Sequence, residues 1–378
     1  MLDSDYVPRL LEKGLSDFGK SCRAKILLGP RQVGKSTLLE KLTRGTKRIV
    51  LSGEDESDLA VLSDVGSSLR LTQEFEAIVI DEAQYVPSIG RIIKRLVDTN
   101  KTGAKIYVTG SSSLDLAAGI KESAAGRFET KNLWALSLEE LAGKTSWIES
   151  KRELPQYMIY GMLPATINEP EKARDYLLDF SDAILYKDLF SLSEMRKPTE
   201  LVRLVKYLAH SVGSDVRYGS IANELGIQNK TIERYVDLLE AAFIIKVVPS
   251  LSRNPKSELK LSKKIYFCDN GIRNALIRDF TPLAAREDAG ALWENFFFTE
   301  RLKFHANRRD GAEIYFWRNL AKHEVDFLDV LDGKVRAFEC KLKNTKRTTA
   351  IRAFERAHPE SPVTIATPEN IDTILTSA

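Results

Sequence analysis

Between residues 24 and 37 the chain reads Ala24-Lys25-Ile26-Leu27-Leu28-Gly29-Pro30-Arg31-Gln32-Val33-Gly34-Lys35-Ser36-Thr37. An apolar run leads into a glycine turn, and a helical pattern follows. The Gly-x4-Gly-Lys-Ser spacing in this strand–turn–helix context is the phosphate-binding P-loop pattern. Glycines let backbone N–H groups surround phosphate oxygens, and a helix N-terminus favours negative charge. A plain glycine turn would not require Lys-Ser after its second glycine, so we predict a nucleoside triphosphate site over Gly29–Thr37.

A second apolar strand, at residues 78–80, ends in the adjacent acids Asp81 and Glu82. Beside a P-loop, such a pair is typical of a magnesium-dependent nucleotide hydrolase. We expect Lys35 to neutralise the β- and γ-phosphates and the Ser36 hydroxyl to ligate Mg²⁺. Asp81 would hold the same ion through water, and Glu82 would polarise the attacking water. Two acids after a strand can also simply cap a helix. The predicted cofactors are ATP and Mg²⁺, and the predicted activity is ATP hydrolysis.

The first third of the chain alternates strand-like and helical runs, which predicts βαβ units and a parallel sheet covered by helices. The predicted strands are residues 24–28, 48–51, 76–80, 104–109 and 130–136.

Polar residues follow the fourth predicted strand, at the sheet edge where a ligand is expected. Ser111 or Ser112 could sense the γ-phosphate there, or belong to a hydroxyl-rich loop. Arg127 is our candidate for an arginine that reaches the γ-phosphate of a neighbouring subunit. A surface salt bridge is the alternative role for Arg127. An arginine acting between subunits predicts a homo-oligomer, with a hexamer as the expected form.

Composition indicates a globular protein of several domains. Apolar residues make up 43% and charged residues 29%, and the net charge of +3 is too small to indicate nucleic-acid binding by itself. No run of eighteen apolar residues is present, so we expect no transmembrane helix and no membrane partner. The cysteines at 22, 268 and 340 suit neither a disulfide framework nor a zinc site, and favour a reducing cytoplasm.

Residues 218–239 have the spacing of a helix-turn-helix, with the first helix ending at Gly226. Two strands, 243–248 and 263–268, would follow as a hairpin with a basic wing between them. We expect the second helix to face DNA and the wing to contact phosphates. The module could instead serve only for packing, because Glu233 and Asp237 lie on the same helix. The candidate DNA-binding residues are Gln228, Asn229, Lys230, Arg234, Lys256 and Lys260.

Asp332-Gly333 is a strong two-residue hairpin signal between residues 324–331 and 334–341. Pairing outward from this turn sets Asp326 opposite Glu339, and Lys341 opposite Glu324. Like charges directly opposed on a sheet are destabilising, so something positive should lie between the two carboxylates. Magnesium fits this requirement. A Lys341–Glu324 salt bridge in a fold that only holds DNA or partners is the alternative.

Taken together, the motifs resemble a prokaryotic family of AAA-type ATPases with a C-terminal domain of unknown function. Beyond the P-loop, the resemblance is carried by Ile80-Asp81-Glu82-Ala83-Gln84, Thr109-Gly110-Ser111-Ser112, Leu163-Pro164, Lys264-Ile265-Tyr266-Phe267, Asp269-Asn270-Gly271, Leu292-Trp293-Glu294-Asn295, Trp317-Arg318, Glu324-Val325-Asp326-Phe327 and Glu339-Cys340-Lys341.

The resemblance implies a multidomain α/β protein with an AAA+ P-loop core at residues 1–140 and a helical lid at 141–205. A winged helix at 206–270 and a nuclease-like domain at 271–378 would follow. The last domain resembles the PD-(D/E)xK nuclease core. By that resemblance Asp326 and Glu339 bind Mg²⁺, Glu294 assists, and Lys341 helps to activate water or to steady the phosphate.

Three functions are compatible with these patterns. The first is an ATP-driven DNA motor of the translocase or helicase type, which could remodel branched DNA. An AAA+ core followed by a winged helix is also how the bacterial Holliday-junction branch-migration motor is built, by analogy only. The second is an ATP-gated, Mg²⁺-dependent DNA nuclease. The third is a regulatory switch that uses ATP to change protein partners.

Overall fold

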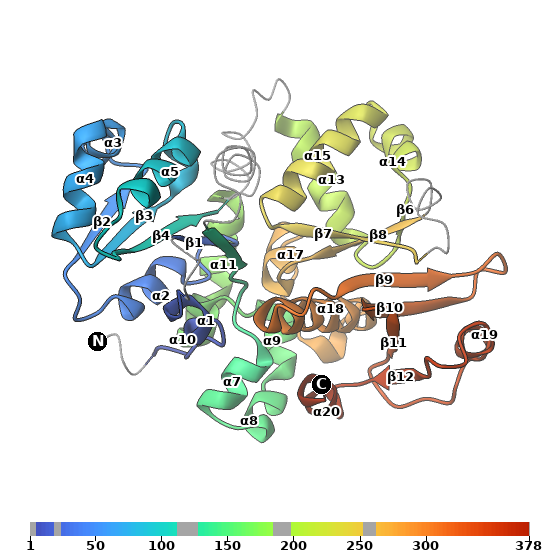
Figure 1. The fold of residues 1–378 in the computed structure, drawn as a ribbon. Helices are drawn as coiled ribbons and strands as arrows, with labels where there is room; N and C mark the ends of the chain where they lie inside the picture. The colour runs from blue at the N-terminus through green and yellow to red at the C-terminus, as the bar shows by residue number, and fades with distance from the viewer. Residues whose placement is uncertain (1–4, 19–23, 112–127, 184–197, 252–261, 378) are drawn as a thin grey trace. The chain divides into compact units, whose positions relative to one another are not determined.

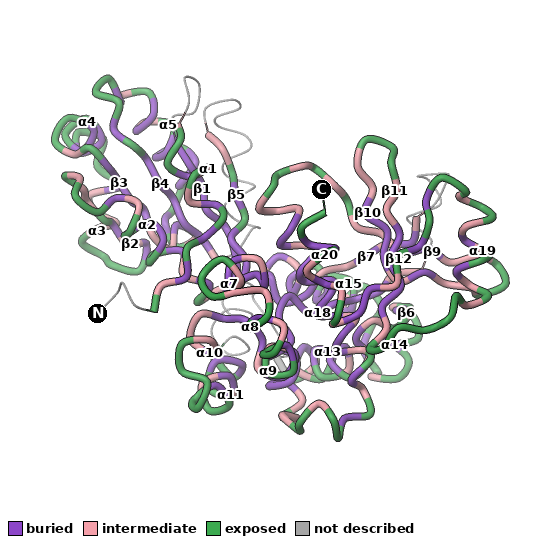
Figure 2. Tube along the Cα trace, turned by 90° about the horizontal axis from the view of Figure 1, so that it is seen from below, coloured by how far each residue is buried: buried purple, intermediate pink, exposed green. Residues whose placement is uncertain are grey.

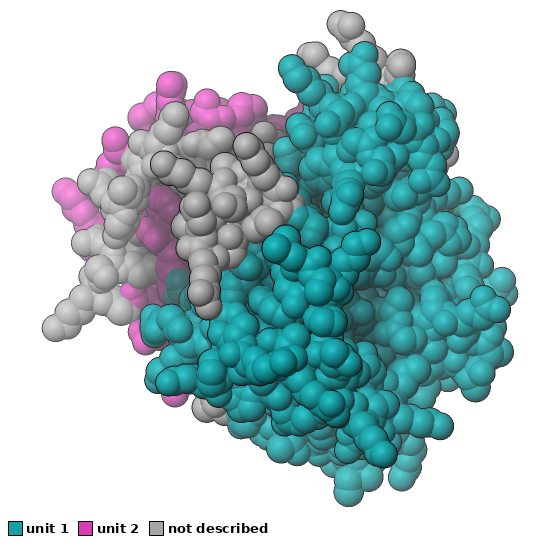
Figure 3. All heavy atoms as spheres, turned by 90° about the vertical axis from the view of Figure 1, so that its right-hand side faces the viewer, with its two compact units in different colours: residues 1–7, 136–240, 244–378 teal, residues 8–135, 241–243 magenta. Residues whose placement is uncertain are grey.

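The structure is a computed structural model and describes residues 5–18, 24–111, 128–183, 198–251 and 262–377. The chain divides into two compact units. The first unit, drawn in magenta as unit 2 in Figure 3, comprises residues 8–135 with 241–243. The second, drawn in teal as unit 1, comprises residues 1–7, 136–240 and 244–378. The four predicted domains do not correspond one to one with these units, and their boundaries stay predictions. Ser112, Arg127, Lys256 and Lys260 lie outside the described residues.

The first unit is built on a parallel five-stranded sheet of order β2-β3-β4-β1-β5 (Figure 1). Its strands are β1 (Ala24–Leu28), β2 (Arg48–Ser52), β3 (Ala77–Asp81), β4 (Lys105–Gly110) and β5 (Phe128–Asn132). Its helices are α1 (Glu12–Ser16), α2 (Lys35–Leu42), α3 (Glu56–Ser63), α4 (Val65–Glu74), the 3₁₀ turn η1 (Ala83–Tyr85) and α5 (Ile89–Thr99). Every residue of β1 is buried, as expected of a central parallel strand (Figure 2). The prediction of a parallel α/β core is confirmed.

The last strand of this sheet is shorter than predicted. Residues 133–136 are buried but lie outside β5, which ends at Asn132. Leu133 still donates its N–H to the Leu28 carbonyl at 2.7 Å, and its own carbonyl lies against Gly29. A Cβ atom at Gly29 would come within 1.9 Å of that oxygen. The apolar run therefore continues as buried coil beside the P-loop, and its periodicity alone resembles a strand.

The second unit opens with helices and turns over residues 138–183, namely α7 (Leu138–Lys144), α8 (Trp147–Arg152), α9 (Leu154–Tyr160), α10 (Pro164–Asn168), η2 (Pro170–Lys172) and α11 (Ala173–Ala183). It continues with α13 (Pro198–His210), β6 (Asp215–Val216), α14 (Tyr218–Leu225), α15 (Asn229–Ala241), β7 (Ile245–Pro249), β8 (Lys263–Phe267) and α17 (Asn270–Leu276). Gly226 ends α14 with φ of 67°, where a left-handed residue is needed. Strands β6, β8 and β7 form an antiparallel sheet in that order, and β6 has no counterpart in the sequence prediction.

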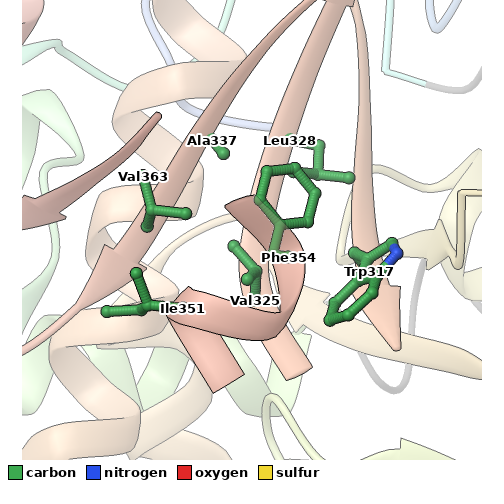
Figure 4. Close-up of a cluster of buried hydrophobic side chains, with 7 residues drawn as sticks. All are labelled: Trp317, Val325, Leu328, Ala337, Ile351, Phe354 and Val363. Carbon is green, nitrogen blue, oxygen red and sulfur yellow. The ribbon is translucent and has the colours of Figure 1, made fainter. Parts of the chain in front are cut away.

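The C-terminal part contains η4 (Leu283–Ala285), the long helix α18 (Ala289–Arg308), β9 (Glu313–Arg318), β10 (Glu324–Leu331), β11 (Lys334–Cys340), α19 (Thr349–Ala357), β12 (Val363–Ala366) and α20 (Ile371–Thr376). Its sheet has the order β12-β11-β10-β9, with β12 parallel to β11 and the other pairs antiparallel. Helix α19 packs Ile351 and Phe354 against one face, with Trp317, Val325, Leu328, Ala337 and Val363 (Figure 4). Of the described helices, none is long and apolar enough to cross a membrane.

The predicted hairpin is confirmed for residues 327–331 with 334–338. Asp332 and Gly333 both have positive φ, 49° and 77°, as a tight two-residue turn requires. The register runs from Leu331↔Lys334 to Phe327↔Phe338, and the predicted pairs Asp326–Glu339 and Glu324–Lys341 lie beyond it. Lys341 lies one residue beyond the end of β11.

Candidate functional site

The P-loop joins β1 to α2 and takes its shape from glycines and a buried lysine. Gly34 has φ of 90° and precedes the first residue of α2. Lys35 is 5% exposed, and its ammonium donates to the Gly29 carbonyl at 2.9 Å and to the Pro30 carbonyl at 2.8 Å. The lysine is therefore held inside the loop predicted to wrap the phosphates. Ser36 and Thr37 lie exposed at the start of α2.

The two predicted ligands of the nucleotide-bound magnesium lie together. The Ser36 hydroxyl donates to Asp81 Oδ2 at 2.8 Å, although the residues come from different elements. Hydroxyl and carboxylate oxygens are the ligand types that Mg²⁺ prefers, so this donor set fits the ion. The other carboxylate oxygen, Oδ1, accepts from the Thr109 hydroxyl and from the Glu82 N–H. Thr109 on β4 thus fixes the orientation of Asp81.

Glu82 follows β3 in a left-handed conformation, with φ of 48°. Its carboxylate accepts from the side-chain amide of Gln84 at 2.5 Å. The same amide nitrogen lies 3.1 Å from the Ser111 hydroxyl, and the Gln84 carbonyl oxygen accepts from the Ser111 N–H at 3.3 Å. Gln84 therefore links the predicted hydrolytic carboxylate to the predicted γ-phosphate sensor at the end of β4.

Two side chains that sequence reasoning did not single out support the loop. Gln84 stands in the acidic motif and could have been found from its two-residue distance to Glu82. Arg9 carried no signal, because it is distant in sequence from its partners. Its guanidinium, 7% exposed, donates to the Val33 carbonyl at 2.8 Å and to the Trp134 carbonyl at 2.7 Å. Arg31 of the loop donates to the Tyr85 hydroxyl at 2.9 Å.

The candidate DNA-binding residues of α15 and the turn before it lie on the surface. Gln228, Asn229, Lys230 and Arg234 are all exposed. Glu233 and Asp237 on the same helix are exposed as well. Partial desolvation on this exposed face, followed by the neighbouring charge of Glu240, raises the pKa of Asp237. The exposed face of this helix therefore carries charges of both signs.

The nuclease-like residues gather around a lysine that was not among the predicted site residues. Lys264 of β8 is 2% exposed, and its ammonium lies 2.6 Å from Glu324, 3.0 Å from Glu294 and 3.8 Å from Asp326. Tyr266, on the same face of β8, donates its hydroxyl to Glu294 at 2.6 Å. The positive charge was expected between Asp326 and Glu339; the structure instead supplies two lysines, Lys264 beside Asp326 and Lys341 beside Glu339.

The predicted partners of Asp326 are arranged differently from a metal site. Asp326 Oδ2 accepts from the Cys340 N–H at 2.8 Å. Lys341 pairs with Glu339 at 2.8 Å, while Arg318 pairs with Glu324 at 2.5 Å. One oxygen of Glu339, Oε2, is buried and has no hydrogen-bond partner. Over the described ranges, no group of three or more His, Cys, Asp or Glu side chains is placed to hold a metal ion. The predicted nuclease Mg²⁺ does not fit this arrangement, because a lysine ammonium stands among its ligands.

Other residues of the resemblance motifs have structural roles. Asn295 of α18 accepts from the Phe267 N–H and donates to the Phe267 carbonyl, at 2.8 and 3.0 Å. Asp269 caps α17 and also accepts from the Met162 N–H at 2.8 Å. Gly161 is required beside it, since a Cβ atom there would lie 1.8 Å from Asp269 Oδ1. These contacts fix the end of β8 against α18.

Comparisons with known proteins agree with the P-loop geometry. Residues 21–142 match a family described as an AAA domain. Residues 151–283 and 289–373 match two different domains of unknown function.

Curated relatives cover most of the chain. An uncharacterized protein of Mycobacterium tuberculosis is 27% identical over 85% of this chain and 70% of its own length. One of Haemophilus influenzae is 25% identical over 82% of each chain, and one of Methanocaldococcus jannaschii is 25% identical over 89% of this chain and 78% of its own.

Solved structures that align with parts of the chain include a Walker-type ATPase of Pyrococcus abyssi, 15% identical, with a TM-score of 0.49 over 73% of this chain and 97% of that one. RuvB of Thermotoga maritima, 16% identical, aligns over 68% of this chain and 88% of its own with a TM-score of 0.30. The domain match, the strand order and the P-loop contacts together identify residues 21–142 as an AAA-type P-loop ATPase domain.

Proposed function

We propose that this protein hydrolyses ATP at the P-loop and uses the energy to process DNA. The observation that carries the hydrolytic part is the 2.8 Å contact between Ser36 and Asp81, with Glu82 next in the chain. The Ser36 hydroxyl, the Asp81 carboxylate and Glu82 as candidate base therefore lie at the carboxyl edge of one parallel sheet. That edge is where α/β sheets bind ligands.

The residues have separate roles in this proposal. Lys35 neutralises the β- and γ-phosphates, and backbone N–H groups of the loop after Pro30, from Arg31 to Ser36, bind their oxygens. Ser36 directly and Asp81 through water would hold Mg²⁺, which would shield phosphate charge. Glu82 accepts a hydrogen bond from the attacking water and orients it. Thr109 keeps Asp81 in position. Gln84 keeps Glu82 in position before Ser111 contacts the nucleotide.

Assembly completes the site in this proposal. Arg127 of one subunit stabilises the charge that develops on the γ-phosphate of its neighbour. A closed ring, with a hexamer as the expected form, brings every nucleotide next to such an arginine. Either Ser111 or Ser112 has the sensing role.

The DNA-processing part rests on residues 198–267. Helices α13, α14 and α15 followed by the hairpin of β7 and β8 have the element order expected of a winged helix. The exposed side chains of Gln228, Asn229, Lys230 and Arg234 suit contacts with DNA bases and phosphates. Lys256 and Lys260 would add phosphate contacts from the wing. Duplex or branched DNA, including four-way junctions, is the proposed substrate of a translocase or helicase activity.

The nuclease alternative is less well supported, because a lysine already pairs with each of its acids. Its proposed ligands Asp326 and Glu339 and the assisting Glu294 are engaged with Lys264, Lys341 and the Cys340 N–H. A switch between protein partners remains the competing outcome of the experiment below.

The test measures ATP turnover by the purified protein alone and with duplex, single-stranded and four-way-junction DNA. Lys35→Ala should lower turnover at least about 100-fold, because the phosphates lose their main counter-charge. Lys94→Ala, an exposed lysine of α5, is the matched control and should retain full turnover. Stimulation by DNA, strongest with the junction, supports the motor.

A double variant separates the DNA part of the proposal from the hydrolytic part. Lys230→Ala with Arg234→Ala should keep basal turnover but weaken DNA stimulation, and should lower the salt slope of DNA binding by about 2. Robust turnover that no DNA alters, with a protein co-purifying on the ATP-bound form, would replace the motor by the partner switch.

A further inference from the structure

We propose that Lys264 is a built-in cation that takes the place of the divalent metal in the nuclease-like carboxylate cluster. The cluster consists of Glu294 on α18, Glu324 and Asp326 on β10, and Glu339 on β11. Lys264 comes from β8, in a different sheet of the same unit. The ion pairs of these acids with Lys264 then connect β8 to α18 and β10, and the wild-type protein binds no metal there.

The geometry of the ammonium supports this assignment. The Lys264 ammonium lies within hydrogen-bonding distance of Glu324 and Glu294, at 2.6 and 3.0 Å, and forms a longer ion pair with Asp326 at 3.8 Å. The side chain is 3% exposed, and Phe316 lies under the ammonium with 5.5 Å between the nitrogen and the ring centre. A lysine this buried is stable only when its charge is paired, which the three acids achieve.

The position of Lys264 is fixed by its surroundings. Asn295 bonds both backbone groups of Phe267 at the end of β8, and β8 pairs with β6 through Asp215↔Lys264. Asp215 continues the network through Arg318, at 2.9 Å, and Arg318 pairs with Glu324. The lysine therefore enters the cluster from a strand held on both edges, because β7 pairs with the other side of β8.

The charge of the fourth acid, Glu339, is neutralised by a different lysine. Glu339 pairs with Lys341, and Asp326 accepts from the Cys340 N–H. The buried, unpartnered Oε2 of Glu339 is the one feature of the cluster that could suit an added cation. The experiment must therefore examine metal binding by the wild-type protein as well as by a lysine variant.

The test uses nucleotide-free full-length protein and follows its thermal midpoint as MnCl₂ is added to millimolar concentration. Lys264→Ala should lower the midpoint by roughly 5 °C or more, because it leaves unpaired buried carboxylates. Manganese should restore a large part of the loss by entering the vacated position. Lys263→Ala, the preceding residue of β8 and only half-buried, is the matched control and should not respond beyond the wild-type protein. The P-loop is the same in all three proteins, so the difference isolates the cluster.

Two results would overturn the proposal. One is an equal manganese response in wild type, Lys263→Ala and Lys264→Ala; the other is no response in a folded Lys264→Ala protein. If that variant does not fold, manganese bound to wild-type protein is counted by electron paramagnetic resonance and compared with Asp326→Asn. Equal counts support Lys264 as the cation, whereas a lower count in Asp326→Asn shows that the wild-type cluster already holds metal.

Discussion

The P-loop site and the nuclease-like cluster each contain a buried lysine and several acids, but the two lysines have different partners. Lys35 bonds to carbonyls of its own loop, at 2.8 and 2.9 Å, and Asp81 bonds instead to Ser36, Thr109 and the Glu82 N–H. Lys264 lies among Glu294, Glu324 and Asp326. The first arrangement leaves oxygen ligands grouped for an added cation. In the second, the protein neutralises its own acids, so a set of acids in a sequence does not identify its cation.

The largest effect should come from Glu82→Gln, which tests whether the first site is hydrolytic. Glutamine keeps the shape of the side chain but is a much weaker acceptor for the proton of the attacking water. We expect turnover to fall at least about 100-fold while ATP still binds, because general-base assistance typically contributes 10²–10⁴-fold. Turnover is measured by phosphate release, and binding by the fluorescence of a labelled ATP analogue.

Glu56→Gln, at an exposed position of α3, serves as the control for this substitution and should be active. A Glu82→Gln protein with near-normal turnover would remove the hydrolytic role from Glu82. The P-loop site and the nuclease-like cluster would then not be distinguished by a catalytic carboxylate.

An intermediate effect is expected from Gln84→Leu, which removes the amide between Glu82 and Ser111. Leucine is similar in size but cannot hold the Glu82 carboxylate, so the base should lose its orientation. We expect kcat to fall roughly tenfold with little change in KM, since misplacement of a catalytic group costs rate more than binding. Steady-state kinetics with Mg²⁺ and ATP measures both constants.

Gln84→Glu is a second test of the contact between residue 84 and Glu82. It places a carboxylate beside Glu82 and should lower kcat at least as far as leucine does. A large rise in KM with kcat unchanged would show that Gln84 serves nucleotide binding and does not position the base.

The contrast between the two sites also explains what could be predicted from the sequence. The P-loop is local, because its function follows from residues adjacent in one turn, and the parallel strands bring Ser36 and Asp81 together as expected. The β10–β11 hairpin was equally predictable, since Asp332-Gly333 fixes its register.

The position of Lys264 in the nuclease-like cluster could not be predicted in the same way. Lys264 belongs to a strand of another sheet, and no periodicity indicates that β8 turns this side chain towards β10. Arg9 at the P-loop is a similar case, since only the tertiary fold brings it to Val33. The strand predicted for residues 130–136 was too long for a related reason: buried coil and buried strand share the same apolar composition.

The smallest effect concerns the pH dependence of stability. Burial, followed by the charge of Glu294, raises the pKa of Asp326 from 3.8 to about 7, while Lys264 acts in the opposite direction. Between these values the folded protein holds a proton that the unfolded chain has released. The stability from this proton is complete below about pH 4 and is lost as the pH rises through about 7. Wild-type protein should therefore lose thermal stability between pH 5.5 and 8.

Asp326→Asn removes the titrating group but keeps a similar shape, so the variant should lose roughly 3 °C less over the same interval. Asp332→Asn is the control, because Asn tolerates the left-handed turn position that Asp332 occupies, and it should follow the wild-type protein. Glu339, whose pKa is also raised by burial and by Asp326, would leave a residual dependence in the variant. Identical pH profiles in Asp326→Asn and wild type would mean that Asp326 is ionised throughout. Lys264 would then balance three full negative charges instead of chiefly those of Glu294 and Glu324.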